Sequence, residues 1–144
     1  MRMILLVAVA VAVTTVIGCG KGHPDCVPVS GQVLIDGKPV PGGMVRFVPE
    51  KGRPATADIQ SDGRFTMKTF EEGDGVLPGK HIVTVIATKD ISSSKRRWFA
   101  PRKYAIPTKS GLTETIDKPN DSLVINLTWK GEPPGKPFDE KIEN

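Results

Sequence analysis

The sequence contains few of the residues that most often carry catalysis or bind metals. It has two histidines, His23 and His81, and two cysteines, Cys19 and Cys26. None of them lies in a His-x-His, His-Glu-x-x-His or Cys-x-x-Cys motif that could begin a zinc site. A Gly-x-Ser-x-Gly nucleophile elbow, a phosphate-binding loop and a Gly-x-Gly-x-x-Gly turn are absent too. We therefore expect no catalytic residues, no metal and no cofactor, and interpret the chain as not an enzyme.

Aromatic residues are also scarce, at 6% of 144 residues, and neither sign of charge dominates. The 20 lysines and arginines against 16 acidic residues give a net charge of +4, which suits a soluble protein and specifies no partner. The 15 glycines and 13 prolines follow no Gly-X-Y period, which excludes a collagen-like chain. The length suits one domain with appendages, and frequent glycine and proline favour short strands joined by turns.

The first 18 residues differ sharply from the rest and are typical of an export signal. Arg2 supplies the positive charge, and Ile4–Ile17 form an apolar run that only two threonines interrupt. The apolar stretch 3–18 is shorter than the about 20 residues that a helix needs to cross a bilayer. We expect residues 1–18 to be a signal peptide; an uncleaved signal anchor is the alternative.

The end of this segment, Val16-Ile17-Gly18-Cys19, resembles a bacterial lipobox, although Val16 stands where leucine is usual. The resemblance implies that Cys19 carries lipid and that the mature protein is held on a membrane of the cell envelope without a spanning helix. Two or three acyl chains hold a protein stably, because each buried methylene contributes about 0.8 kcal/mol. Residues 19–28 then form a short linker that keeps the domain near the membrane surface.

Cys26 has no intramolecular partner if Cys19 is lipidated. We expect Cys26 to be buried or a free thiol. An intermolecular disulfide and a Cys19–Cys26 disulfide are the alternatives, and the second is incompatible with the lipid. His23, in the same linker, is interpreted as solvated rather than as a metal ligand.

From residue 27 onward the apolar residues alternate with polar ones, and no stretch keeps a helical period. Asp36-Gly37 and Asp62-Gly63 are typical of tight turns between strands. We expect an all-β fold, a single antiparallel β-sandwich of about seven strands. The expected strands are 27–35, 44–48, 57–59, 64–68, 80–88, 112–116 and 123–129.

An ordered series of segments, Gly31–Pro49, Ser61–Phe65 and Leu77–Val85, resembles the carboxypeptidase regulatory-like domain. The later segment Lys103–Thr113 resembles the version found in short planctomycete envelope lipoproteins. The resemblance covers residues 29–130 and implies a prealbumin-like (transthyretin-type) sandwich with Greek-key connections. In metallocarboxypeptidases this domain is the companion without catalytic residues, so the resemblance implies a fold rather than an activity.

A cluster of five basic and three aromatic residues occupies positions 95–104, inside the longest segment without a strand pattern, 89–110. Long loops are often functional, and tryptophan, tyrosine and arginine are enriched in binding hot spots. Contact with an anionic membrane or a protein partner is one interpretation; a lid on the end of the sandwich is another. Nucleic acid is not expected for an exported protein. The candidate interaction residues are Arg96, Arg97, Trp98, Phe99, Arg102 and Tyr104.

The acidic residues of the central loops are interpreted as structural. Asp36, Asp62 and Asp74 each precede a glycine and suit tight turns; a calcium site, the alternative, would need about six convergent oxygens. Glu71 and Glu72 are interpreted with Asp74 as a solvated loop rather than as the paired carboxylates of a glycosidase.

Two further residues or segments complete the expectations. His81 is expected to be a half-buried or exposed strand residue. The tail 131–144, with five prolines or glycines and six charged residues, is expected to be disordered, with binding of a partner as an alternative role.

Taken together, these patterns favour a lipid-anchored cell-envelope β-sandwich that acts as a structural or protein-interaction module without enzymatic activity. The expected partners are the membrane, through Cys19, and an envelope protein or polysaccharide. A carrier of a small ligand or carbohydrate is the alternative function. The sequence does not specify which partner or ligand is bound.

Overall fold

The computed structural model describes residues 22–143, in which the regular elements are strands apart from one short 3-10 helix, so the predicted all-β fold class is confirmed. The expected signal peptide 1–18 and Cys19 lie outside the described residues. The elements are β1 (Val29–Ile35), β2 (Lys38–Pro39), β3 (Gly43–Pro49), β4 (Ala55–Ile59), β5 (Arg64–Thr66), β6 (Gly79–Ile86), β7 (Thr88–Ser92), β8 (Lys95–Trp98), the 3-10 helix η1 (Arg102–Ala105), β9 (Leu112–Ile116), β10 (Asn120–Leu127) and β11 (Phe138–Lys141).

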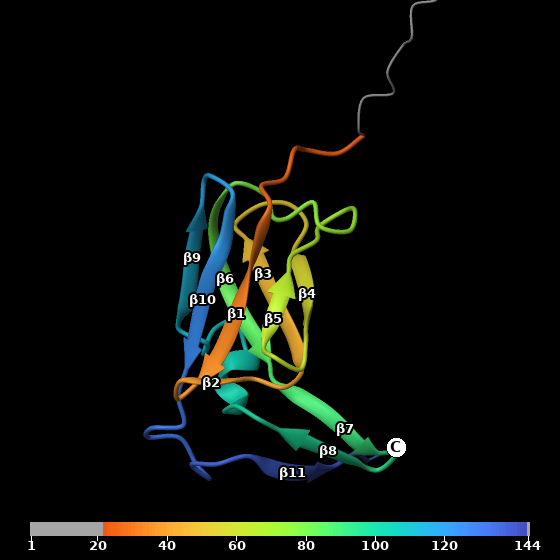
Figure 1. Ribbon diagram of the computed structural model, residues 1–144, viewed down its shortest axis with the longest axis vertical. Helices are drawn as coiled ribbons and strands as arrows, with labels where there is room; N and C mark the ends of the chain where they lie inside the picture. Colours follow the sequence, from red (N-terminus) through yellow and green to blue (C-terminus); the bar gives the residue numbers. More distant parts are fainter. Residues whose placement is uncertain (1–21, 144) are drawn as a thin grey trace, which may run out of the picture.

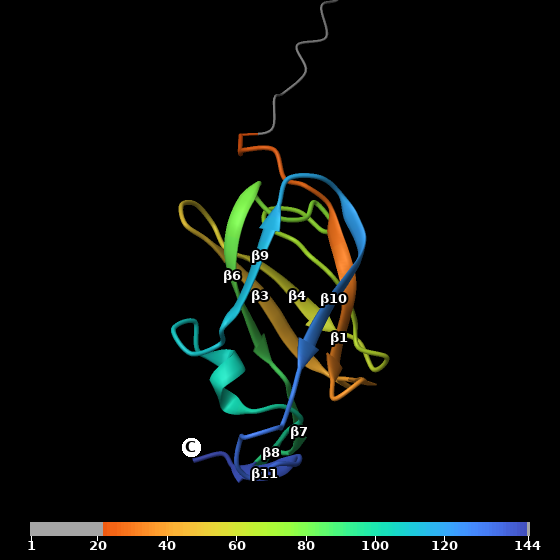
Figure 2. The same ribbon diagram turned by 90° about the vertical axis from the view of Figure 1, so that its left-hand side faces the viewer.

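The described strands form three sheets. In the β1 sheet the order is β10-β1-β2, with β5 also paired to β1; in the β3 sheet it is β4-β3-β6-β9. These two sheets face each other as two layers (Figures 1 and 2). The third, the β8 sheet, has the order β11-β8-β7 and lies below them, at the end opposite to where the described chain begins (Figure 1).

The core lies between the two facing sheets, as the alternation of apolar residues predicts. Phe47 on β3, Val83 on β6 and Val33 on β1 are each 0% exposed. On β10, Ile125 and Leu127 are buried, whereas Val124, which directly precedes Ile125, is 46% exposed. The period of two therefore identified the covered face of β3 and β10. On β6 the expected cover on both faces is incomplete, because Ile82 is 42% exposed.

The expected single antiparallel sandwich of about seven strands is corrected in two respects. There are more strands and a third sheet, and β1 pairs with β10 in parallel, for example Val33 with Ile125. Gly31 lies in this pair, and a Cβ added there would be 1.9 Å from the Leu123 carbonyl oxygen. Glycine is thus required by the close approach of the β10 backbone.

The two Asp-Gly turns are present; Asp62-Gly63 follows the expected strand, whereas Asp36-Gly37 leads from β1 to the short strand β2 and not directly to the expected strand 44–48. Asp36 and Gly37 both have positive φ, 47° and 80°, and close the short β1–β2 hairpin. The expected return strand, β3, belongs to the other sheet. The Asp62-Gly63 turn joins β4 to β5 and so carries the chain from the β3 sheet to the β1 sheet.

Two segments expected to lack strands contain them. Segment 89–110 holds most of β7, all of β8 and the helix η1, and tail 131–144 holds β11, which pairs with β8. These strands are short and polar, and their burial patterns contain no fully buried residue. Because both faces of the strands keep polar groups, the alternation that identifies a strand is missing from their sequence.

Candidate functional site

The candidate site is the β8 sheet, where the basic cluster meets the C-terminal segment. Four of the expected interaction residues, Arg96, Arg97, Trp98 and Arg102, lie on β8 or at the start of η1. The other two do not belong to this surface: Tyr104 is buried, and Phe99 packs against the core. The Tyr104 hydroxyl accepts a hydrogen bond from the Thr128 N–H at 3.2 Å. Phe99 and Tyr104 therefore pack with the hydrophobic core.

The arginines of β8 are paired with carboxylates from both neighbouring strands. Arg97 donates from Nε and Nη2 to the two oxygens of Asp139 on β11, at 2.6 and 3.1 Å. Arg96 donates from Nε to Asp90 on β7 at 2.7 Å. Hydrogen bonding to arginine lowers the pKa of Asp139 and of Asp90 below their ordinary value. Such forked pairs specify geometry more than they stabilise an exposed surface.

Aromatic rings from β8 and β11 form the second part of the site. The Trp98 and Phe138 rings stack with 6.3 Å between centroids and 7° between planes. The Arg102 guanidinium lies over both rings, 5.4 Å from Trp98 and 5.2 Å from Phe138. Glu140 accepts a hydrogen bond from Trp98 Nε1 at 2.7 Å and one from Arg102 Nη2 at 2.5 Å. One acidic side chain thus links the ring stack to the cation above it.

The residues of the tail that pair with β8 and η1 were not predicted from the sequence. Phe138, Asp139 and Glu140 lie in the segment expected to be disordered, and Glu132 from the same segment accepts a hydrogen bond from Lys103 Nζ at 2.7 Å. A signal was present: an aromatic residue followed by two acids complements a cluster of arginines and tryptophan.

The acidic loop 71–74 has a structural role for Asp74, as expected. The Asp74 carboxylate accepts hydrogen bonds from the backbone N–H groups of Thr69, Phe70 and Glu71, at 2.7, 2.9 and 3.0 Å. Burial acts to raise the pKa of Asp74, but these three donors outweigh it, so the pKa lies below its ordinary value of 3.8.

We expect Asp74→Asn to lower the free energy of unfolding at pH 7 by about 1–3 kcal/mol, because an amide cannot accept from all three N–H groups. Since the folded pKa is depressed, the wild-type contribution is complete above the ordinary value of 3.8 and is lost as the pH falls from there through the folded pKa. Chemical denaturation from pH 7 to pH 2 would measure this. Glu72→Gln, on the exposed Lys68–Glu72 pair, is the matched control; equal pH profiles for wild type and Asp74→Asn would contradict the assignment.

The linker docks onto this loop instead of standing free. His23 stacks on Phe70 with 4.2 Å between ring centroids, and Val27 pairs with Val76 through two backbone hydrogen bonds of 2.7 and 2.9 Å. Cys26 is half-buried and is not in a disulfide, and burial raises the pKa of its thiol. The described part of the linker, residues 22–28, is therefore positioned by the domain.

His81 differs from the expectation of a half-buried or exposed residue, because its side chain faces the core and is 1% exposed. Its Nε2 lies 2.7 Å from the Leu77 carbonyl oxygen, and its ring centroid is 5.6 Å from that of Phe47. Nδ1 has no hydrogen-bond partner among the described residues. The inward position follows from the parity of β6, which His81 shares with buried Val83.

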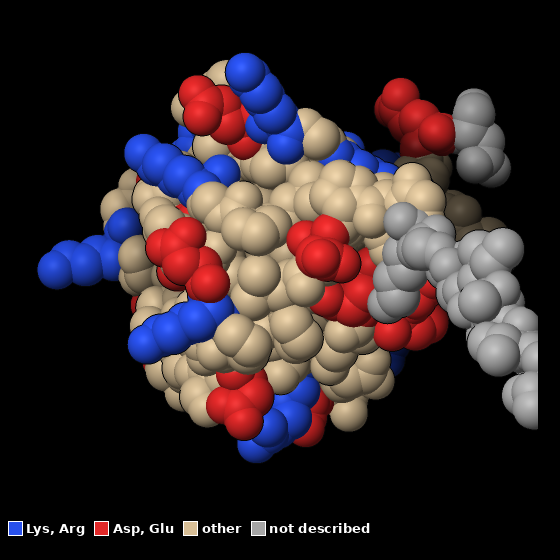
Figure 3. Space-filling model, turned by 90° about the horizontal axis from the view of Figure 1, so that it is seen from above, with Lys and Arg blue, Asp and Glu red and all other residues tan. Residues whose placement is uncertain are grey.

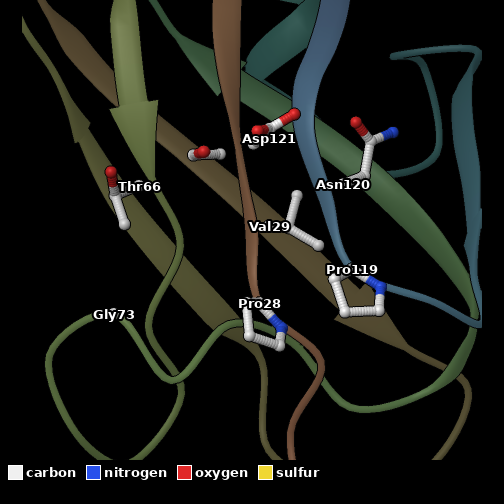
Figure 4. A pocket seen from close by; sticks show the side chains of 8 residues that line it. Pro28, Val29, Thr66, Gly73, Pro119, Asn120 and Asp121 are labelled. Atoms are coloured by element: carbon white, nitrogen blue, oxygen red, sulfur yellow. The ribbon is translucent and has the colours of Figure 1, made fainter.

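Several clefts lie outside the β8 sheet. Figure 4 shows one of about 290 Å³ beside the start of β1, where Asn120 and Asp121 each accept a hydrogen bond from Ser122. Another, of about 330 Å³, is lined by apolar side chains that include Phe99 and Trp129 and by three charged side chains. A small-ligand carrier, the alternative hypothesis, would hold its ligand in this second cleft.

Within residues 22–143, no group of three or more histidine, cysteine, aspartate or glutamate side chains is placed to hold a metal ion. In the same range no helix has the length and apolar character needed to cross a bilayer.

Comparison with known proteins gives one significant similarity. The chain is 33% identical over 103 residues to the tRNA-dihydrouridine(47) synthase of Schizosaccharomyces pombe, in an alignment that covers 71% of this chain. It spans 16% of the length of that relative. No family model matches the chain, and no solved structure matches it significantly.

The similarity corrects one prediction. The matching protein is named as an enzyme, which contradicts the expectation that this chain is not an enzyme. That expectation rested on the absence of a few short motifs, and an activity does not require those motifs.

Proposed function

We propose that the chain is an exported cell-envelope protein, anchored by lipid on Cys19, that binds another envelope component, a protein or a polysaccharide, through its β8 sheet. The lipobox resemblance at residues 16–19 supports the anchor. We further propose that the β1 and β3 sheets form one prealbumin-like sandwich, to which the β8 sheet is appended.

The position of the β8 sheet is the observation that carries this proposal. The described chain begins at one end of the molecule, and the β8 sheet lies at the other (Figure 1). A lipid anchor at Cys19 would therefore hold the β8 sheet away from the membrane. On the end where the described chain begins, acidic side chains gather beside the grey residues, and basic side chains project separately around the rest of the visible face (Figure 3). This favours a partner beyond the membrane over contact of the basic cluster with anionic lipids.

The composition of the β8 sheet suits a binding surface. Trp98, Arg97 and Arg102 are of the residue types that dominate binding hot spots, and the side chains of all three are partly exposed. Both outer strands of this sheet, β7 and β11, have an edge that no described strand covers. Such edges can pair with an extended segment of another chain.

The test is cross-linking in intact envelopes of the native host. The triple variant Arg96→Ala, Arg97→Ala, Trp98→Ala is expected to reduce capture of a defined partner about thirtyfold, which corresponds to the loss of one hot spot of about 2 kcal/mol. Arg46→Ala with Lys80→Ala, on exposed positions of the β3 sheet, is the matched control and should leave capture unchanged. If the wild type, the triple variant and the control variant all cross-link to the same envelope proteins, the proposal is overturned.

The intact mass of the protein from the same envelopes tests the anchor separately. We expect residues 1–18 to be absent and acyl chains to be present on Cys19. A mass that includes residues 1–18, or that leaves the Cys19 sulfur bare, would overturn the lipid anchor.

The similarity to the tRNA-dihydrouridine(47) synthase favours a second candidate function, a part in the modification of tRNA. Arginines beside an exposed tryptophan can contact phosphates and stack on bases. Binding of tRNA that weakens steeply with salt and is lost in the triple variant would support this candidate. That result, together with no capture of an envelope partner, would replace the first proposal.

A further inference from the structure

Strand β11 is an added strand on the β8 sheet rather than part of the sandwich. It pairs with β8 in the register Phe138 to Trp98 and Asp139 to Arg97. Residues 128–137 separate it from β10 and include two glycines and three prolines. No residue of β11 belongs to the core cluster. The strand is therefore attached by its edge and by its side chains.

The β8 edge recognises β11 through three kinds of contact. The β8 backbone pairs with an extended segment, and the Arg97 fork takes the carboxylate of Asp139. The Phe138 ring lies stacked on Trp98 and forms a T-shaped pair with Trp129, with 6.4 Å between ring centroids. Glu140 takes the hydrogen bonds of Trp98 and Arg102 described above. The surface thus selects an aromatic residue followed by two acids, in an extended conformation.

These contacts are accessible to competition. The side chains of Arg97 and Arg102 are 46% and 52% exposed, and their partners Asp139 and Glu140 are each 32% exposed. Exposed ion pairs stabilise little and are screened by salt. The covalent connection keeps β11 on these weak contacts, because a short linker gives an effective concentration on the order of millimolar.

We propose that the β8 edge, with Arg97, Trp98 and Arg102, is a docking groove for an acidic extended strand of a partner protein, which displaces β11. This inference rests on the proposed function and specifies the chemistry of the protein partner. The strand it fits carries an aromatic residue followed by two acidic residues, as in Phe138-Asp139-Glu140. The groove is closed by β11 in the free protein and opens when a partner strand outcompetes it.

The experiment uses the full chain and a fluorescent peptide with the sequence of residues 131–143. In the variant Asp139→Lys with Glu140→Lys, the chain's own strand is repelled by the arginines and the groove is free. Fluorescence anisotropy at low salt is expected to show that this variant binds the peptide at least tenfold more tightly than the wild type does, since the tethered strand no longer competes. Equal affinities of the two chains would overturn the proposal.

A charge exchange tests the contacts themselves. Adding Arg97→Glu and Arg102→Glu to the opened variant should abolish binding of the acidic peptide. In the same chain the two lysines introduced into β11 now face glutamates, so the tail should return to the groove. Limited proteolysis would show this, because the tail should be cleaved readily in the opened variant and as slowly as in the wild type after the charge exchange. An opened variant that forms a concentration-dependent dimer and excludes the peptide would overturn the assignment to a partner protein.

The docking groove and the proposed function can fail independently of each other. If the peptide does not bind but the Arg96→Ala, Arg97→Ala, Trp98→Ala variant still loses its envelope partner, the surface binds by another mode and only the docking groove is wrong. If capture is unaffected while the peptide binds, the groove exists but the proposed function fails.

Discussion

Replacing Phe47 with alanine is expected to lower the free energy of unfolding by about 3–5 kcal/mol. Phe47 is 0% exposed and lies at the centre of the β3 sheet, paired with Val83 on β6 and Ala55 on β4. Its ring also packs beside the buried His81 ring. Truncation removes the transfer free energy of the ring and leaves a cavity that two hydrogen-bonded neighbouring strands cannot close.

Denaturant titration would measure the loss, with Val124→Ala as a control. Val124 is 46% exposed on β10, so its truncation should change the free energy of unfolding by no more than about 0.5 kcal/mol. A Phe47→Leu variant should lie between alanine and wild type, because leucine fills part of the space. A loss for Phe47→Ala as small as that for Val124→Ala would mean that the two sheets do not share one core.

The sequence was sufficient to find most strands around this core, since most of them alternate apolar and polar residues over several positions. The parity of β10 and the two Asp-Gly turns were predicted from local residues alone. The neighbour of each strand and the parallel or antiparallel direction of the pairing were not predicted. Alternation specifies the face that a strand buries but not the strand beside it, so the parallel pairing of β1 with β10 could not be read from the pattern.

Local sequence patterns also explain why only part of the candidate site was predicted. Arg96, Arg97, Trp98 and Arg102 were grouped correctly because they are close in the sequence. Their partners in β11 are about 40 residues away, with separations of 42 for Arg97 to Asp139 and 38 for Arg102 to Glu140. A segment as short and charged as β11 has no local preference strong enough to predict a strand, and it forms because β8 supplies both a backbone edge and opposite charges.

Ion pairing also changes the interpretation of the basic cluster at residues 95–104. As a sequence, the five basic residues at 95–104 suggested a positive surface. In the structure, Arg96, Arg97, Arg102 and Lys103 each have a carboxylate partner, and three of those partners come from the tail. A positive surface therefore develops only when the tail leaves, which makes displacement of β11 the event that changes the electrostatics of this end.

The parallel pair of β1 and β10 gives the second large expected effect, at Gly31. A Gly31→Val variant is expected to lose at least about 3 kcal/mol of stability, more than an ordinary surface change, because the clash is with backbone. The added Cβ would lie 1.9 Å from the Leu123 carbonyl oxygen, so β10 must move away from β1. That movement would also pull Ile125 out of the core.

Gly42→Ala is the matched control, because a Cβ there comes no closer than 3.8 Å to the Thr88 carbonyl oxygen, an ordinary contact. We expect it to change the melting temperature little, whereas Gly31→Ala should already lower it and Gly31→Val should lower it further or prevent folding. The graded order within one position separates a local clash from general intolerance to substitution. Wild-type melting temperatures for both Gly31 variants would show that β10 does not lie against β1 at this residue, and the parallel pairing would then be wrong.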